Sequence, residues 1–143
     1  MMRKLFFVIY CSVLLTSCSE KNNIDNIVSE KWEKCDNHVD CVVDFATSMQ
    51  FQWDTMYFFS GANSKEDIEK ELRLTYDQWE DVGDKVIFLN KGNIVYQQDW
   101  FLNPDKLVDG TVFLTDLKMF KIDKSSSKFR ISKKSKVFYL QKM

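Results

Sequence analysis

Three side chains that can bind a metal or react as nucleophiles lie close together near the N-terminus. Cys35, His38 and Cys41 are each separated by two residues, and His38 is the only histidine of the chain. A structural zinc site takes four nitrogen or sulfur ligands, and the sequence offers no second cluster that would complete one. In an exported domain, two cysteines at this spacing are expected to close a disulfide loop. We therefore predict a Cys35–Cys41 disulfide, with a metal site or two free thiols as alternatives.

Acidic side chains offer a second kind of chemistry. Glu80, Asp81 and Asp84 precede a predicted hairpin. Paired carboxylates hydrolyse glycosidic bonds and grouped carboxylates bind calcium, but the spacing selects neither, so we interpret the segment as a solvated acidic loop. Triad catalysis would have to recruit His38, and the four glycines form no phosphate-binding loop. The sequence thus predicts no catalytic residue, no metal and no cofactor.

The carboxyl group of Asp54 has two interpretations, one structural and one functional. It directly follows Trp53 at the entrance to an aromatic strand. It either caps a turn and accepts backbone hydrogen bonds, or it is partly desolvated with a raised pKa and contacts a ligand. We favour the turn.

Tryptophans and lysines supply candidate contacts for a ligand or partner. Trp79 and Trp100 are flanked by acids and loops, so we expect them to be the most exposed of the four tryptophans and to stack on a ligand if any tryptophan does. We favour the other interpretation, that the tryptophans belong to the core, because the aromatic side chains of a small domain more often do. Lys133, Lys134 and Lys136 form a basic group near the C-terminus. They either contact an anionic lipid or an acidic protein, or protect the edge of the last strands.

The charge of the chain is divided along its length. The net charge of −1 becomes −3 without Arg3 and Lys4, which belong to the N-terminal signal described next. Residues 118–143 contain nine basic residues and one acid, a net charge of +8, which leaves −11 for residues 18–117. Such a division is typical of proteins with a charged partner surface.

The N-terminus has the organisation of a secretory signal. Arg3 and Lys4 precede an apolar run of about 11 residues, which ends in Leu-Thr-Ser-Cys18. The cysteine at the cleavage point resembles the lipobox of bacterial lipoproteins, and the resemblance implies a lipid anchor on Cys18. Ser19, rather than Asp, follows it, which favours an outer-membrane protein of the cell envelope that faces the periplasm. The alternatives are an uncleaved helix and a secreted protein with an incidental cysteine.

The rest of the chain predicts a single α+β domain. We expect a signal peptide over residues 1–17, the lipidated Cys18 with a tether over 18–23, and the domain over 24–143. Helical periodicity indicates helices over 24–35 and 65–74, the second capped by Ser64. The expected strands cover residues 51–59, 86–89, 94–96, 117–122, 129–132 and 137–140. Residues 40–49 fit either a strand or a helical turn, and 100–105 a loop. We therefore predict an antiparallel sheet of about five or six strands with one or two short helices packed on it.

One motif adds a resemblance to a family. Phe51-x-Trp53-Asp54 precedes a capped helix and a hairpin with an Asn-Lys-Gly-Asn turn. This arrangement resembles a set of small uncharacterised bacterial lipoproteins over roughly residues 41–100. Members of that set usually have Pro-Tyr-Thr after the strand, and this chain has residues 60–63 in its place. The resemblance implies the compartment and the fold and carries no activity.

These observations favour a binding protein over an enzyme. We expect a non-catalytic envelope lipoprotein, attached to the membrane by its lipid anchor, that binds an envelope protein. The alternative is an immunity-type lipoprotein whose acidic part captures a basic toxin. An envelope hydrolase comes third, and nucleic acid is not an expected partner in this compartment.

Overall fold

The fold is α+β, as predicted, but its strands form two sheets instead of one. The computed structural model describes residues 23–36, 38–101 and 109–143. In these ranges, sheet A has the strand order β1 (Val42–Asp44), β7 (Lys128–Lys134), β8 (Val137–Lys142) and β5 (Gly110–Phe113). Sheet B has the order β4 (Asn93–Phe101), β3 (Gly83–Asn90), β2 (Thr55–Phe59) and β6 (Met119–Asp123). Pairing is antiparallel except between β5 and β8.

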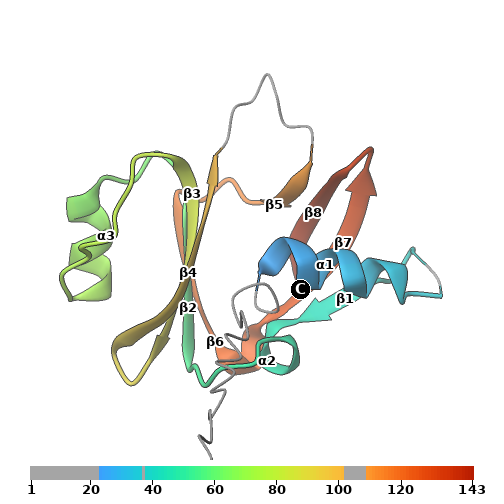
Figure 1. The fold of residues 1–143 in the computed structure, drawn as a ribbon, viewed down its shortest axis with the longest axis horizontal. Helices are drawn as coiled ribbons and strands as arrows, with labels where there is room; N and C mark the ends of the chain where they lie inside the picture. The colour runs from blue at the N-terminus through green and yellow to red at the C-terminus, as the bar shows by residue number, and fades with distance from the viewer. Residues whose placement is uncertain (1–22, 37, 102–108) are drawn as a thin grey trace, which may run out of the picture.

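The two sheets and one helix form successive layers. Figure 1 shows sheet B between sheet A on one side and α3 (Lys65–Leu72) on the other. Strand β2 is buried on both faces: Phe58 belongs to the core between the sheets, and Phe59 belongs to the core under α3. An aromatic strand without Pro or Gly suits this position, because neither of its faces meets water. Ile68 and Leu72 are the buried residues that α3 contributes.

The transition from sheet B to sheet A explains why a single sheet was a wrong prediction. Strand β6 ends at Asp123, a 3-10 turn (Lys124–Ser126) follows, and β7 starts at Lys128 in the other sheet. Alternating apolar residues indicate that a strand has a buried face, but they do not indicate which sheet it joins. The core between the sheets therefore contains side chains of both, among them Phe88 and Phe129.

Helix α1 (Ile24–Glu33) lies across sheet A and contacts its two edge strands, β1 and β5. Its buried residues Ile24 and Val28 belong to the core between the sheets. The N-cap residue Asn23 accepts hydrogen bonds from the backbone N–H groups of Asp25 and Asn26 through Oδ1. These bonds satisfy donors that the first helical turn leaves open and so stabilise the start of the helix.

The predicted disulfide joins the end of α1 to the start of β1. The sulfur atoms of Cys35 and Cys41 are 2.03 Å apart, and their Cα atoms are 5.8 Å apart. The imidazole ring of His38 stacks on the indole of Trp32, with 4.2 Å between the ring centroids. In the described ranges, no group of three or more His, Cys, Asp or Glu side chains is arranged to hold a metal ion.

The remaining predicted elements are found with shifted bounds. The ambiguous segment contains both β1 and a single helical turn, α2 (Phe45–Ser48), and the capped helix ends at Leu72. The strand expected from residue 51 begins only at Thr55. Residues 1–22, with the predicted signal and Cys18, lie outside the described residues. Within the part described, no helix has the length and apolar character needed to cross a membrane.

Candidate functional site

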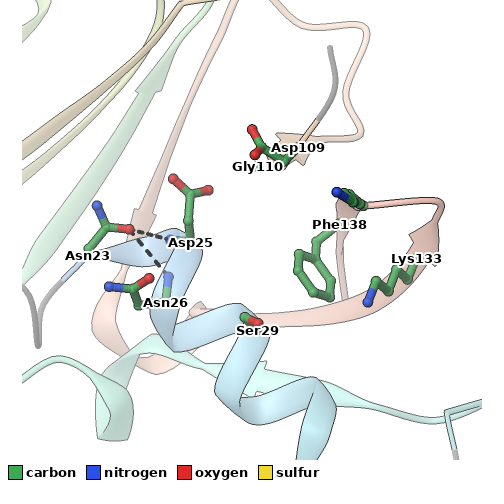
Figure 2. A pocket seen from close by; sticks show the side chains of 9 residues that line it. Asn23, Asp25, Asn26, Ser29, Asp109, Gly110, Lys133 and Phe138 are labelled. Atoms are coloured by element: carbon green, nitrogen blue, oxygen red, sulfur yellow. Dashed lines mark hydrogen bonds between the residues drawn. The ribbon is translucent and has the colours of Figure 1, made fainter.

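A polar groove lies between helix α1 and the β7–β8 hairpin. We call it the α1 groove, and its volume is about 510 Å³. It is lined by Asn23, Asp25, Asn26, Ser29, Asp109, Gly110, Lys133, Lys136 and Phe138. In Figure 2, Asp25 and Asp109 lie on one side, Lys133 lies on the other, and the ring of Phe138 lies between them. The groove thus brings two of the predicted lysines together with two acids.

Asp25 is held in place by β4, an edge strand of sheet B. Its carboxylate accepts a hydrogen bond of 2.9 Å from Gln98 Nε2, and Trp100 Nε1 lies 3.1 and 3.2 Å from its two oxygens. Gln98 Oε1 in turn accepts from the backbone N–H of Ile24 at 2.8 Å and from the Tyr96 hydroxyl at 2.7 Å. Burial, followed by the negative charge of Asp25, raises the pKa of Tyr96 to about 12. Strand β4 therefore fixes the acidic side of the groove.

Sequence reasoning missed Asp25 and its partner Gln98. An acid in the first turn of a helix is expected because the helix dipole favours negative charge there. This local pattern does not show that Asp25 also binds Gln98 and Trp100, the latter 75 residues further along the chain. Nor does it show that Asp25 lines the groove.

Gly110 lies beside this carboxylate at the start of β5. Its φ angle is +105°, in the region that side chains disfavour, so the backbone conformation favours glycine here. A Cβ atom built there would lie 3.8 Å from Asp25 Oδ1, an ordinary van der Waals contact. The exposed Asp109 immediately precedes it and adds a second carboxylate to the same side of the groove.

The β7–β8 hairpin provides the basic side. Lys133 is directly opposite Phe138 in the register, so both project from the same face of sheet A. The Lys133 Nζ atom lies 5.0 Å from the centroid of the Phe138 ring. Lys134 is opposite Val137 and therefore projects from the other face. The predicted basic group is thus divided: Lys133 and Lys136 line the groove, and Lys134 does not.

The positive charge of the groove comes from these two lysines. The first backbone N–H groups of α1 are bonded to Asn23 and Gln98 and are not available as an anion site. Both Lys133 and Lys136 are exposed. The ion pairs found among the described residues are Lys34–Glu30, Lys65–Glu69 and Lys85–Asp99, so neither groove lysine belongs to one.

Of the two tryptophans expected to be the most exposed, Trp100 is buried and Trp79 is half-buried. Trp100 lies in β4, is 9% exposed, and packs against Phe113 with 5.9 Å between ring centroids. The predicted loop is strand here because β3 begins at Gly83 and pairs with β4 as far as Phe101. Trp79 is half-buried and packs against the core under α3. The expected exposure is therefore wrong for Trp100, whereas Trp79 keeps part of its surface exposed.

Asp54 caps a turn, and the alternative of a raised pKa is wrong. Its carboxylate is fully exposed and accepts hydrogen bonds from the Lys91 N–H at 2.6 Å and from the Thr55 hydroxyl at 2.8 Å. The Lys91 N–H bond is the main cause that lowers the pKa of Asp54. Asp54 sits beside the β3–β4 turn, at the opposite end of β4 from Trp100 and the groove.

A second polar cluster is buried under the segment that follows α3. Lys85 is 3% exposed, and its Nζ atom lies 3.7 Å from the Asp99 carboxylate. Burial raises the pKa of the Asp99 carboxyl and of the Tyr76 hydroxyl. Among the described residues, Tyr76 Oη, Trp79 Nε1 and Gln97 Oε1 have no hydrogen-bond partner. No sequence pattern indicates this cluster, because Lys85 directly precedes an apolar run.

The acidic loop expected before the hairpin is only partly a loop. Glu80 and Asp81 are exposed, whereas Asp84 lies in β3. Asp84 accepts the backbone N–H of Gly61 at 3.0 Å, and burial raises the pKa of its carboxyl. The three acids therefore have separate environments.

Comparison with protein-family models, with curated proteins and with solved structures finds no match to this chain. Function is therefore inferred from the residues and their arrangement. The α1 groove is the site on which we base it, since it gathers charged side chains from three separate parts of the chain.

Proposed function

We propose that this protein is a non-catalytic lipoprotein of the cell envelope that binds a protein partner through the α1 groove. The observation that carries the proposal is the groove itself, with acids on one side and lysines on the other. Neither groove lysine belongs to an ion pair within the described ranges, so its charge is available to a partner. Opposite charges on two proteins speed their encounter and fix their relative orientation.

The environment of Asp25 suits a preformed binding site. Both carboxylate oxygens accept hydrogen bonds from side-chain N–H groups of sheet B. These donors fix the position and orientation of the carboxylate, as a binding site held on rigid elements requires.

The membrane anchor would place the groove close to the bilayer. Asn23, which lines the groove, lies five positions after Cys18, the residue that we propose to be lipidated. A random-coil chain of five residues has a root-mean-square end-to-end distance of roughly 12 Å. Because Ser19 follows the anchor, we place the protein at the outer membrane, facing the periplasm, with its partner at the same surface.

Site-specific photo-cross-linking in intact cells tests the proposal. A photoreactive amino acid at Ser29, inside the groove, is expected to capture one protein partner on the membrane-anchored protein. The control position is Ser132, which is exposed on the outer face of β7 and does not line the groove. Equal capture at both positions, or none at Ser29, would contradict a partner in the groove.

A second candidate function is an immunity-type lipoprotein that neutralises a basic toxin. Helix α3 and the segment after it expose acids on the side of sheet B that is remote from sheet A, namely Glu66, Asp67, Asp77, Glu80 and Asp81 (Figure 1). This surface favours a basic protein. A photoreactive group at the exposed Gln78 distinguishes the two functions, because only the immunity function predicts capture there.

A further inference from the structure

The α1 groove carries charges of opposite sign on opposite sides. Asp25 and Asp109 come from α1 and the start of β5, whereas Lys133 and Lys136 come from the β7–β8 hairpin. The Phe138 ring lies between the two sides in Figure 2. No ion pair closes the groove in the described ranges, since every such pair joins other residues. Each side is therefore open to a charge of the opposite sign.

A ligand with a single charge does not fit this arrangement. An anion near the lysines would also meet two carboxylates, and a cation near the carboxylates would also meet two ammonium groups. Like charges placed together across an interface are unfavourable. A molecule that carries an ammonium group and a carboxylate at separate ends satisfies both sides at once.

The size and the remaining lining narrow the class of ligand. The volume of about 510 Å³ falls within the range of roughly 300–1,000 Å³ that is usual for small-ligand sites. Between the charged sides, Phe138 offers an apolar contact and Ser29 offers a hydroxyl. A short peptide supplies matching groups, because its amides can bond to a hydroxyl and its side chains can pack on a ring.

We infer that the α1 groove binds a short zwitterionic peptide segment, with its ammonium group at Asp25 and Asp109 and its carboxylate at Lys133 and Lys136. The inference rests on the proposed function, and it specifies the chemistry of the partner segment that enters the groove. A free peptide and a charged segment of a larger protein share this chemistry. In both cases the two charges lie a few residues apart.

Titration of the purified full-length protein with trialanine tests the inference. The affinity of trialanine with free termini is compared with that of its N-acetylated and C-amidated forms by isothermal titration or NMR shifts. Blocking either end is expected to weaken binding about fivefold, which corresponds to about 1 kcal/mol for an exposed ion pair. Added salt is expected to weaken the binding of free trialanine most.

Three variants assign each charge to its side of the groove. In Lys133→Gln/Lys136→Gln, amidation of the peptide is expected to have no further effect, whereas N-acetylation still weakens binding. Asp109→Asn is expected to reduce the effect of N-acetylation, and this exposed residue is preferred to Asp25, which also holds α1 to β4. Lys134→Gln is the matched control, because Lys134 projects from the other face of β7.

Absence of saturable trialanine binding would overturn the inference. So would an effect of amidation that persists unchanged in the double lysine variant. These failures are distinct from failure of the proposed function, because a protein partner captured at Ser29 would still establish the groove as a binding site. Binding that requires only the carboxylate end would indicate an anion site, and would also overturn the zwitterionic assignment.

Discussion

Removal of one indole N–H is expected to loosen α1 from sheet B. Trp100 Nε1 donates to the Asp25 carboxylate, with 3.1 Å to the nearer oxygen, and the indole is 9% exposed. Trp100→Phe removes this donor and keeps most of the packing against Phe113. A hydrogen bond to a charged group contributes about 1.5–3 kcal/mol. Because Asp25 is only half-buried and keeps its bond to Gln98, the lower half of that range applies.

Trp79→Phe is a matched comparison, because it removes an indole N–H that makes no hydrogen bond to any described residue. Trp79 Nε1 is buried and has no hydrogen-bond partner among the described residues. Its removal relieves a desolvated donor, which offsets the loss of packing from the smaller ring. We therefore expect Trp100→Phe to lower the free energy of unfolding by about 2 kcal/mol more than Trp79→Phe. For a domain of this size the difference corresponds to about 8 °C in Tm.

Urea denaturation followed by circular dichroism measures both variants. A double-mutant cycle with Asp25→Ala and Trp100→Phe then isolates the contact, because Ala has no acceptor for the indole N–H; the expected coupling is about 1.5 kcal/mol. Equal destabilisation by the two tryptophan variants, together with zero coupling in the cycle, would refute the idea that this bond fixes the acidic side of the groove.

Three further predictions concern stability. Replacement of both Cys35 and Cys41 by Ser is expected to lower the free energy of unfolding by about 2 kcal/mol, because the disulfide closes a loop with a sequence separation of 6. In a reducing agent, which opens the disulfide of the wild type, the two proteins are expected to be equally stable. Asp54→Asn lowers Tm at neutral pH. The lowered pKa of Asp54 contributes stability above its ordinary value of 3.8, and this contribution is lost as the pH falls through the lowered pKa, so Tm measured against pH converges with wild type in acid. Lys85→Met alone is expected to be more destabilising than Lys85→Met combined with Asp99→Leu, because the single change leaves a largely buried carboxylate without its cation. Chemical denaturation of both variants compares their free energies of unfolding.

Local sequence patterns predicted most helices and strands of this fold. Ser64 and Asp67 form the reciprocal capping box that starts α3, and the Asn-Lys-Gly-Asn turn joins β3 and β4. Asp54 caps a turn as favoured, because a short acid beside a tight turn finds backbone donors within a few ångströms. These features depend on residues close in sequence or on a hydrophobic period.

The features that escaped prediction depend on contacts between distant parts of the chain. The flanking acids and the only proline predict a loop at Trp100, yet pairing with β3 extends the strand past it. Lys133 and Lys134 are neighbours in sequence, and only the register with β8 shows that they face opposite sides. The groove itself could not be predicted, because its lining comes from α1, the start of β5 and the β7–β8 hairpin, and residue spacing does not indicate that these elements lie together.

The most direct test of the central claim is partner capture by charge-reversal variants in intact cells. Lys133→Glu/Lys136→Glu and the single control Lys134→Glu are compared with the wild-type, membrane-anchored protein after chemical cross-linking and affinity capture. If the α1 groove is the binding site, the double variant loses the partner that both the control and the wild type recover. Recovery of the same partner by all three proteins, or of no partner by any, would contradict binding through the groove.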